Sequence, residues 1–385
     1  MPALTTEQTF GNLMFDSGVM TATGCNDEGC KGYQKPTKLV PLIEGDSYFT
    51  QAVETMSAGL ANAATGQTGA PIIMSVHGRS GNTYECLRKG GCGFLLEKGY
   101  TSAFDEAMKQ VADAKALVQP TGKTYRVGAV TAVHGESDHY ANQYPLQPSG
   151  GGVALTSYAD ALVEWQRDYD AGIRALTGQQ QAVPLLISQM SNWNDRRTSE
   201  IPRLQIEAHT RASGKVVLVG PTYMLPYAGD CIHFTNHGER RLGEYFAKAY
   251  ARVVNGGAWE PLRPVDAKPD RNTIHVRFTV PKPPLVLDTT QITDPGSYGF
   301  EVVDAAGTSV PIQTVQISAP DTVTITLGSD AVVGMQVRYA LNATPQTCPG
   351  PETGPRGNLR DSDTAKSNYG YDLSNWSVHF EMPVR

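Results

Sequence analysis

The chain has 385 residues, longer than one ordinary domain, and this length favours two. Hydrophobic residues make up 40% and charged residues 18%, and the 39 glycines and 25 prolines point to a folded protein with long loops. The net charge of −6 comes without a Lys/Arg block, which argues against nucleic acid or an anionic membrane surface as a partner and favours a neutral or weakly charged substrate.

Short apolar runs alternate with helical patterns from residue 39 to residue 253, which is typical of a parallel sheet flanked by helices. The expected strands are 39–43, 71–76, 125–133, 183–188 and 215–220. Helical stripes begin at Phe49, Tyr158 and Leu242, and the last helix has a start signal in Asn236 with Glu239 three residues later. We therefore predict an α/β domain over residues 1–258.

The character of the chain changes after Ala258. The stretch 259–272 holds three prolines and several charges, and it is predicted to be a linker. Short β-rich runs separated by Gly, Pro and Asp turns follow, so residues 273–385 are predicted to form an all-β sandwich domain.

The sequence shows neither a membrane span nor a signal peptide. No apolar run reaches the roughly 18 residues of a membrane span. The first 21 residues have neither the charged nor the apolar region of a signal peptide, so none is expected within this chain.

Six cysteines fall in predicted loops. Cys25 with Cys30 and Cys86 with Cys92 are pairs that lie close in the sequence. Cys231 and Cys348 remain, and they could form a long-range pair. Zinc half-sites are the alternative, but nearby His partners are lacking, so disulfides and an extracellular or periplasmic location are expected.

The segment after the last predicted strand carries the first candidate site. Asp230 precedes His233 by three residues, directly before the Asn236 start signal. A carboxylate at this spacing can accept the Nδ1 hydrogen bond of the imidazole and leave Nε2 free as a general base. The alternative is a surface carboxylate beside a helix-capping histidine.

Three other strand ends carry polar residues. His134 to His139 form a cluster without metal-ligand spacing, so a hydrogen-bonding loop is expected there and no metal or cofactor is predicted. Ser80 and Gly81 lie in a turn that is flanked by glycines. Its backbone amides can face an oxyanion, and the alternative is a tight turn with no catalytic role. Ser47, in Gly45-Asp46-Ser47, precedes a helical stripe and is a candidate nucleophile.

Three strings resemble the blocks of sialate O-acetylesterase-like carbohydrate esterases, a branch of the SGNH hydrolases. They are Ser75 to Asn82, Val133-His134-Gly135-Glu136-Ser137-Asp138, and Gly229 to Gly238 with Asp230 and His233. The resemblance covers roughly residues 10–253. It implies a flavodoxin-like three-layer α/β/α sandwich, with Asp230 and His233 as catalytic residues and His134, in the place of the usual Gln, as an oxyanion donor.

The nucleophile block of these esterases, Gly-Gln-Ser, is not found upstream of Gly11. Ser47 is therefore the predicted nucleophile, with Ser80 and Ser17 as weaker candidates. Pro41 argues against residues 39–43 as a central strand leading to Ser47, because proline cannot donate to a sheet ladder.

The resulting prediction is a serine esterase that hydrolyses O-acetyl esters on carbohydrate. Ser47, His233 and Asp230 would form the triad, and Ser80, Gly81 and His134 would form the oxyanion hole. The alternative from another class is an esterase-derived carbohydrate-binding or structural module without a nucleophile. An esterase acting on polyesters or lipids would share the same site.

Overall fold

A computed structural model describes residues 3–20, 25–26, 29–30, 33–45, 47–48, 51–93, 102–141 and 143–385; at 25–26, 29–30, 47–48 and 51–52 only the backbone is described. The chain forms two compact units. The first comprises Met1–Ile187, Glu207–Val217 and Asn236–Trp259, and the second comprises Ser188–Ile206, Leu218–Thr235 and Glu260–Arg385. The chain is thus a mixed α/β protein with an α/β part and a β part.

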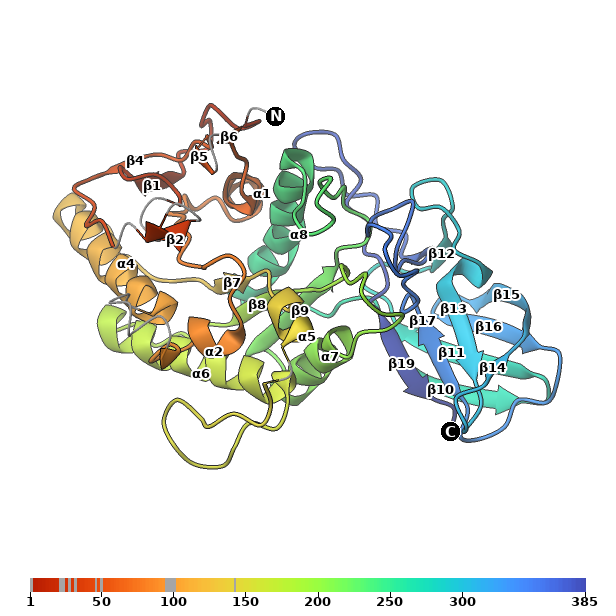
Figure 1. The fold of residues 1–385 in the computed structure, drawn as a ribbon. Helices are drawn as coiled ribbons and strands as arrows, with labels where there is room; N and C mark the ends of the chain where they lie inside the picture. The colour runs from red at the N-terminus through yellow and green to blue at the C-terminus, as the bar shows by residue number, and fades with distance from the viewer. Residues whose placement is uncertain are drawn as a thin grey trace. The chain divides into compact units, whose positions relative to one another are not determined.

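The α/β part is built from short strands and longer helices (Figure 1). Its strands are β1 (Leu13–Phe15), β2 (Cys25–Asn26), β3 (Gly29–Cys30), β4 (Leu39–Pro41), β5 (Ser47–Tyr48), β6 (Gln51–Ala52), β7 (Val130–Ala132), β8 (Leu185–Gln189) and β9 (Val216–Pro221). Its helices are α1 (Met56–Thr68), α2 (Tyr84–Leu87), α4 (Ala103–Val118), the 3₁₀ turn η2 (Gln119–Thr121), α5 (Glu136–Tyr140), α6 (Tyr158–Thr177), α7 (Ile201–Arg211) and α8 (Asn236–Val254).

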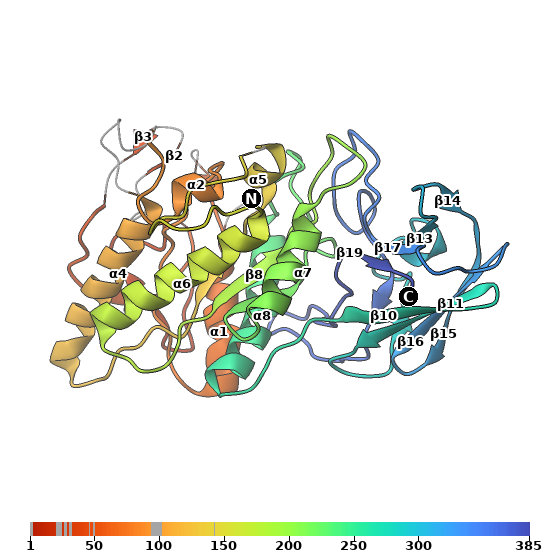
Figure 2. The ribbon, with the colours of Figure 1, turned by 90° about the horizontal axis from the view of Figure 1, so that it is seen from below.

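Strands β7, β8 and β9 form a three-stranded sheet in that order, and β7 pairs with β8 in parallel. Helices α4 and α6 lie on one face of this sheet and α1 and α8 on the other, as Figures 1 and 2 show. A second parallel contact joins β1 to residues 72–74, because Leu13 N donates to Ile72 O and Met74 N donates to Leu13 O, each at 2.9 Å. The predicted strand at 71–76 is therefore present as a short parallel segment.

Helix boundaries follow local capping chemistry. Ser157 accepts a hydrogen bond from Asp160 N at the start of α6, and Gly178 ends this helix with a left-handed φ of 76°. Helix α1 begins at Met56 with Thr55 as its N-cap, later than the stripe predicted from Phe49, which lies outside the described residues. Helix α4 was not predicted from the sequence.

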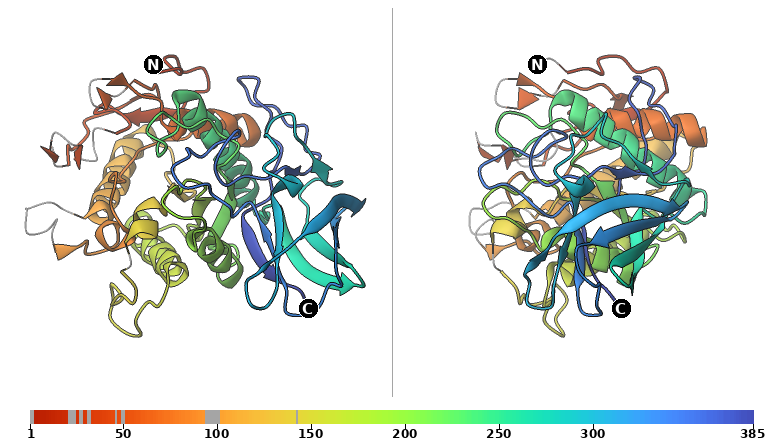
Figure 3. Two further views of the ribbon diagram at one scale, coloured as in Figure 1. Left: turned by 45° about the vertical axis from the view of Figure 1, so that its right-hand side comes forward. Right: turned by 90° about the vertical axis from the view of Figure 1, so that its right-hand side faces the viewer.

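The β part consists mainly of two four-stranded antiparallel sheets, with strand orders β10-β11-β16-β15 and β14-β13-β17-β19 (Figure 3). The elements are β10 (Arg263–Asp270), β11 (Thr273–Thr279), β12 (Val286–Leu287), the 3₁₀ turn η3 (Ser297–Gly299), β13 (Phe300–Val303), β14 (Ser309–Val310), β15 (Ile312–Ala319), β16 (Thr322–Leu327), β17 (Gln336–Tyr339), β18 (Leu359–Arg360) and β19 (Phe380–Pro383).

Aromatic residues join the two sheets. The rings of Phe278 in β11 and Phe380 in β19 lie 5.9 Å apart, and Phe380 stacks on Tyr339 of β17 at 5.5 Å. Along β11, Ile274, Val276 and Phe278 are buried and alternate with more exposed residues, as a strand with one face on a core requires. The stretch 259–272, predicted to be a linker, includes β10, which pairs with β11 in antiparallel register.

Two of the predicted disulfides are present, Cys86–Cys92 and Cys231–Cys348. Cys25 and Cys30 are register partners across β2 and β3, and their side chains lie outside the described part of the chain. Among the helices of the described ranges, none combines the length and the apolar character that crossing a bilayer requires.

Candidate functional site

Asp230 and His233 lie in a short loop that folds back on itself between β9 and α8. Ala228 N donates to His233 O at 2.7 Å and Thr235 N donates to Pro226 O at 3.0 Å, so the loop has the ladder of a small hairpin. The rings of Tyr227 and Phe234 pack across it, 4.6 Å apart. This hairpin fixes the backbone on both sides of the pair.

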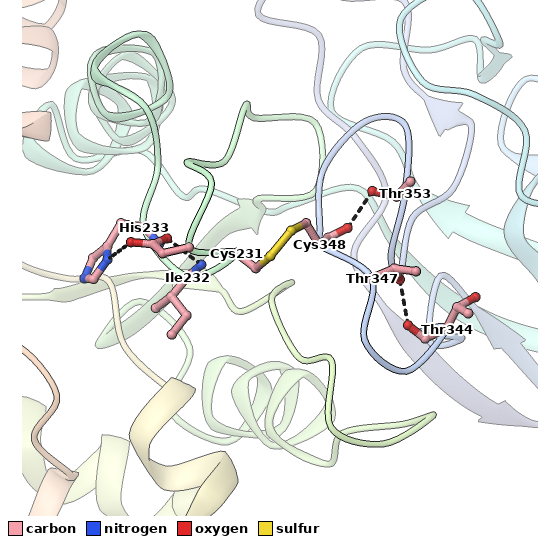
Figure 4. Close-up of a disulfide and its surroundings, with 8 residues drawn as sticks. Cys231, Ile232, His233, Thr344, Thr347, Cys348 and Thr353 are labelled. Carbon is pink, nitrogen blue, oxygen red and sulfur yellow. Dashed lines mark hydrogen bonds and ion pairs between the residues drawn. A yellow bond between two sulfur atoms is a disulfide. The ribbon is translucent and has the colours of Figure 1, made fainter. Parts of the chain in front are cut away.

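The side chains of Asp230 and His233 contact each other directly. Asp230 Oδ2 accepts a hydrogen bond from His233 Nδ1 at 2.8 Å, which Figure 4 draws as the dashed line at the ring of His233. The other carboxylate oxygen, Oδ1, accepts from the backbone amides of Ile232 at 2.9 Å and His233 at 3.0 Å. Both side chains are about half exposed, 50% for Asp230 and 54% for His233.

These contacts keep Asp230 ionised. Partial burial alone would raise its pKa, but the hydrogen bonds from the His233 ring and from the Ile232 and His233 amides outweigh burial and hold the pKa below the ordinary value of 3.8. A carboxylate at Nδ1 keeps the proton on that nitrogen, and Nε2 is then a proton acceptor. The pair has the chemistry of a general base with its orienting carboxylate.

The turn with Ser80 and Gly81 follows the parallel segment at 72–76 in the first unit. Gly81 has a left-handed φ of 70°, and Ser80 is exposed. Asn82 Nδ2 donates to Ser80 O at 2.9 Å inside this turn.

Two side chains that precede Ser80 anchor this turn. His77 Nε2 and the Tyr169 hydroxyl lie 2.7 Å apart, and burial lowers the pKa of His77 to about 4, which keeps it neutral. Arg79 donates to Glu106 of α4 at 2.8 Å, with both side chains 1% exposed. The turn is therefore held on a rigid base.

His134 also contacts this turn. Its Nε2 lies 3.1 Å from Asn82 O and must donate to that carbonyl, so Nδ1 accepts from the Tyr158 hydroxyl at 2.7 Å. In this arrangement the imidazole ties β7 to the segment that carries Ser80 and Gly81. Its predicted role as an oxyanion donor stays a prediction.

The motif residue Asp138 is buried at the first turns of α5. Its carboxylate accepts from Tyr84 N at 2.9 Å and from the Tyr144 hydroxyl at 3.0 Å, and it also contacts Gln143. The hydrogen-bonding role predicted for His134 to His139 is present in Asp138, but the loop is not, because Glu136–Tyr140 form helix α5. Across the described residues, no three His, Cys, Asp or Glu side chains gather closely enough to hold a metal ion.

The two candidate serines Ser47 and Ser17 lie in different structural settings. Ser47 belongs to β5, which pairs in antiparallel register with β6, and its side chain lies outside the described residues. Ser17 lies two residues beyond the end of β1. Its Oγ is buried and has no hydrogen-bond partner within the described chain.

The second unit contains a serine–histidine contact that was not predicted from the sequence. Ser191 Oγ lies 2.6 Å from His379 Nε2, and His379 Nδ1 lies 2.5 Å from Ala340 O. Both residues are fully buried, and burial lowers the pKa of His379 to about 3 despite the Ala340 hydrogen bond. Since 188 residues separate the two, no local sequence signal links them.

The predicted site residues are distributed over the two units. Asp230 and His233 belong to the second unit, where they contact each other, whereas Ser47, Ser80, Gly81 and His134 belong to the first. Within the first unit, Ser80 and Gly81 lie in the turn at residues 80–82, and His134 contacts this turn at Asn82 O.

Comparisons with known proteins find similar structures but no matching sequence family. No protein-family model matches the chain, and no curated protein matches it. A carbohydrate acetylesterase from Xanthomonas citri has a similar structure, with a TM-score of 0.60 and 15% identity over 97% of this chain and 73% of that one. A protein from Arabidopsis thaliana matches with a TM-score of only 0.36, at 15% identity over 63% of this chain and 82% of that one.

The chain therefore shares its fold with a carbohydrate acetylesterase. At this level of identity the likeness concerns the fold alone, and the activity must be argued from the side chains.

Proposed function

We propose that the protein is a secreted serine esterase of the SGNH type, with a flavodoxin-like α/β/α body, that hydrolyses O-acetyl esters on carbohydrate. The observation that carries the proposal is the Asp230–His233 pair, with its 2.8 Å hydrogen bond and half-exposed imidazole. The fold shared with a carbohydrate acetylesterase supports the substrate class. The two disulfides support an oxidising compartment.

In the proposed reaction, His233 Nε2 takes the proton of a serine hydroxyl as the oxygen attacks the acyl carbon. Asp230 holds the ring and stabilises the imidazolium that forms. The imidazolium then protonates the departing sugar oxygen, and His233 activates the water that hydrolyses the acyl-enzyme. The Ser80 and Gly81 amides are the proposed oxyanion donors, and His134 joins them in the proposal by exchanging its Nε2 hydrogen bond from Asn82 O to the oxyanion. Losing one such donor typically costs about 3 kcal/mol.

Ser47 remains the nucleophile predicted from sequence, and the surroundings of Ser17 support it as a second candidate. In parallel α/β sheets functional groups gather at the carboxyl ends of strands, and Ser17 follows such an end because β1 pairs in parallel with residues 72–74. Among the described residues the Ser17 hydroxyl has no partner, an arrangement that costs about 1–3 kcal/mol and for which a catalytic role is one explanation.

Ester hydrolysis tests the catalytic pair. Wild type, His233→Ala and a control, His275→Ala in β11, are assayed on p-nitrophenyl acetate and on acetylated xylan oligomers. His233→Ala should lose on the order of 10³-fold in kcat, and the control should keep wild-type rates. Equal rates for wild type and His233→Ala, above an imidazole background, would reject the pair as catalytic.

Covalent labelling identifies the nucleophile. A fluorophosphonate probe followed by peptide mapping should label one serine in wild type, and the label should be lost in either Ser17→Ala or Ser47→Ala. Binding of an acetylated glycan without labelling of any serine would favour the alternative, a carbohydrate-binding module that lacks a nucleophile.

A further inference from the structure

We propose that the Cys231–Cys348 disulfide is a positioning device for the Asp230–His233 pair, an inference that rests on the proposed function. Cys231 lies inside the motif, between the carboxylate and the imidazole, and its sulfur is bonded to Cys348, 117 residues further along the chain (Figure 4). Both cysteines belong to the second unit.

Few other contacts hold this stretch of chain. Asp230, Ile232 and His233 are all about half exposed, so they gain little from packing. Apart from the hairpin ladder, Cys231 N donates to Ala228 O at 3.0 Å, and Ile232 O accepts from the buried Asn192 amide at 3.1 Å. The disulfide is the covalent restraint at the centre of the motif.

The disulfide maintains an unusual backbone conformation at Cys231. Cys231 has a φ of 64°, a left-handed conformation that is unfavourable for a residue with a Cβ. It turns the chain so that the amides of Ile232 and His233 both point back to Asp230 Oδ1. A cysteine released from the disulfide would gain by relaxing to negative φ, which would move these amides away from the carboxylate.

The partner segment is itself fixed, so it is a suitable anchor. Ala343 N donates to Arg197 O and Gln346 N donates to Asn194 O, each at 2.8 Å, on one side of Cys348. On the other side Thr293 N donates to Pro351 O at 2.9 Å.

Contacts inside the segment tighten it further. The Thr353 hydroxyl donates to Cys348 O at 2.6 Å, and the Thr347 hydroxyl donates to Thr344 O at the same distance (Figure 4). Because the anchor is fixed on both sides, the disulfide transmits its rigidity to Cys231.

The test compares two double variants that each remove one disulfide. Cys231→Ser/Cys348→Ser removes the positioning bond, and Cys86→Ser/Cys92→Ser is the matched control in the first unit. The first readout is the carboxyl pKa of Asp230, followed by carbon-13 NMR titration, which requires no catalytic activity. We expect a pKa below 3.8 in wild type and control, and a rise toward 3.8 in Cys231→Ser/Cys348→Ser, because the amide hydrogen bonds are lost.

The second readout is steady-state kinetics. Misplacing a catalytic group should lower kcat of Cys231→Ser/Cys348→Ser at least about tenfold and leave KM within about threefold, while the control stays near wild type. Circular dichroism checks that each variant is folded. If the double variant does not fold, dithiothreitol is applied to folded Cys86→Ser/Cys92→Ser protein, with alkylation mapping to show that Cys231 and Cys348 have opened.

An unchanged Asp230 pKa after loss of the Cys231–Cys348 bond would overturn the inference, whatever the rates. If wild type hydrolyses no ester, the proposed function fails, and the NMR titration still decides whether the disulfide positions the pair.

Discussion

His233 and His379 each place a ring nitrogen against an oxygen acceptor, yet their surroundings give them opposite chemistry. His233 faces the Asp230 carboxylate and is 54% exposed. His379 faces the Ala340 carbonyl and is fully buried, where burial lowers its pKa to about 3 and keeps it neutral. The His379 ring faces a neutral carbonyl and lacks the carboxylate that stabilises the imidazolium of a general base, which favours a structural role for the Ser191–His379 contact.

Asp230→Asn tests the orienting role of the carboxylate. An amide at this position favours the wrong imidazole tautomer and no longer offsets the imidazolium charge. We expect kcat to fall on the order of 10³ to 10⁴-fold with little change in KM. Steady-state kinetics at neutral pH checks this value. Asp266→Asn, which removes a partly exposed carboxylate from an ion pair with Arg277 in the β part, is the control and should leave kcat unchanged.

The ionisation of Asp230 also sets a pH dependence. Its pKa is lowered in the folded protein, so its contribution to stability is present above pH 3.8 and is lost as the pH falls through the lower folded value. The unfolding free energy of wild type should therefore fall relative to that of Asp230→Asn as the pH drops through this range, as measured by urea titration. Parallel pH dependences of the two proteins would contradict the lowered pKa of Asp230.

At the residue scale, the sequence predicts contacts that are local. The Asp230–His233 hydrogen bond joins residues three apart and follows from their spacing. The contacts of His134 with Tyr158 and Asn82 span 24 and 52 residues, and only the fold brings them together.

At the scale of elements, periodicity predicted α6, α8 and most strands of the β part, because each buries one regular face. Helix α4 was not predicted, since its buried face includes the polar residues Glu106 and Gln110, which interrupt the apolar stripe. Strand β10 was not predicted because its prolines and charges are typical of a linker, whereas one edge of this strand pairs with β11.

The close packing of α1 on α8 depends on glycine. A Cβ at Gly243 would lie 2.1 Å from Met56 O and 2.6 Å from Leu60 N, both backbone atoms of α1. The helices would have to separate, so Gly243→Ala should lower the free energy of unfolding by about 3 kcal/mol. Urea titration followed by circular dichroism measures the loss.

Gly66→Ala is the matched control for this prediction. Gly66 is exposed in α1, and its added Cβ would lie 4.0 Å from the nearest atom, in Phe10. Alanine should stabilise the helix there by about 0.5–1 kcal/mol. If both substitutions changed the free energy of unfolding equally, helix propensity, and not the close approach of the two helices, would determine the effect of Gly243→Ala.

Helix α1 also depends on a buried carboxylate. Glu44 accepts hydrogen bonds from the Thr55 hydroxyl at 2.9 Å and from Ala58 N at 3.0 Å at the start of the helix. Burial, with the charge of Glu54, nevertheless raises its pKa to about 8 from 4.5. The neutral acid is therefore favoured in the folded state, and its stabilising contribution is complete below pH 4.5 and lost as the pH rises to 8.

Glu44→Gln tests this pH dependence. Glutamine keeps an acceptor oxygen for the helix amides but cannot ionise. Wild type should lose more unfolding free energy than the variant between pH 4.5 and pH 8, as measured by urea titration at both pH values. Parallel curves for the two proteins would mean that Glu44 is ionised in the folded state throughout this range.

At the scale of the whole molecule, composition and turn spacing predicted an α/β part followed by a β part, because each architecture has its own pattern of periodicity. The sequence does not show that residues 188–206 and 218–235 belong to the same compact unit as residues 260–385. That association depends on contacts over long distances along the chain, such as the hydrogen bonds between Gln189 and His379, 190 residues apart.

The long-range disulfide makes this association testable through stability. In the chain-entropy model, closing a loop of 117 residues with Cys231–Cys348 restricts the unfolded chain by roughly 5 kcal/mol, against roughly 2 kcal/mol for the six-residue loop of Cys86–Cys92. Cys231→Ser/Cys348→Ser should therefore lower the free energy of unfolding more than Cys86→Ser/Cys92→Ser does. Urea titrations of both variants under oxidising conditions measure the difference. A larger loss from the short loop would mean that native contacts around Cys86 and Cys92, and not loop entropy, dominate the effect of these bonds.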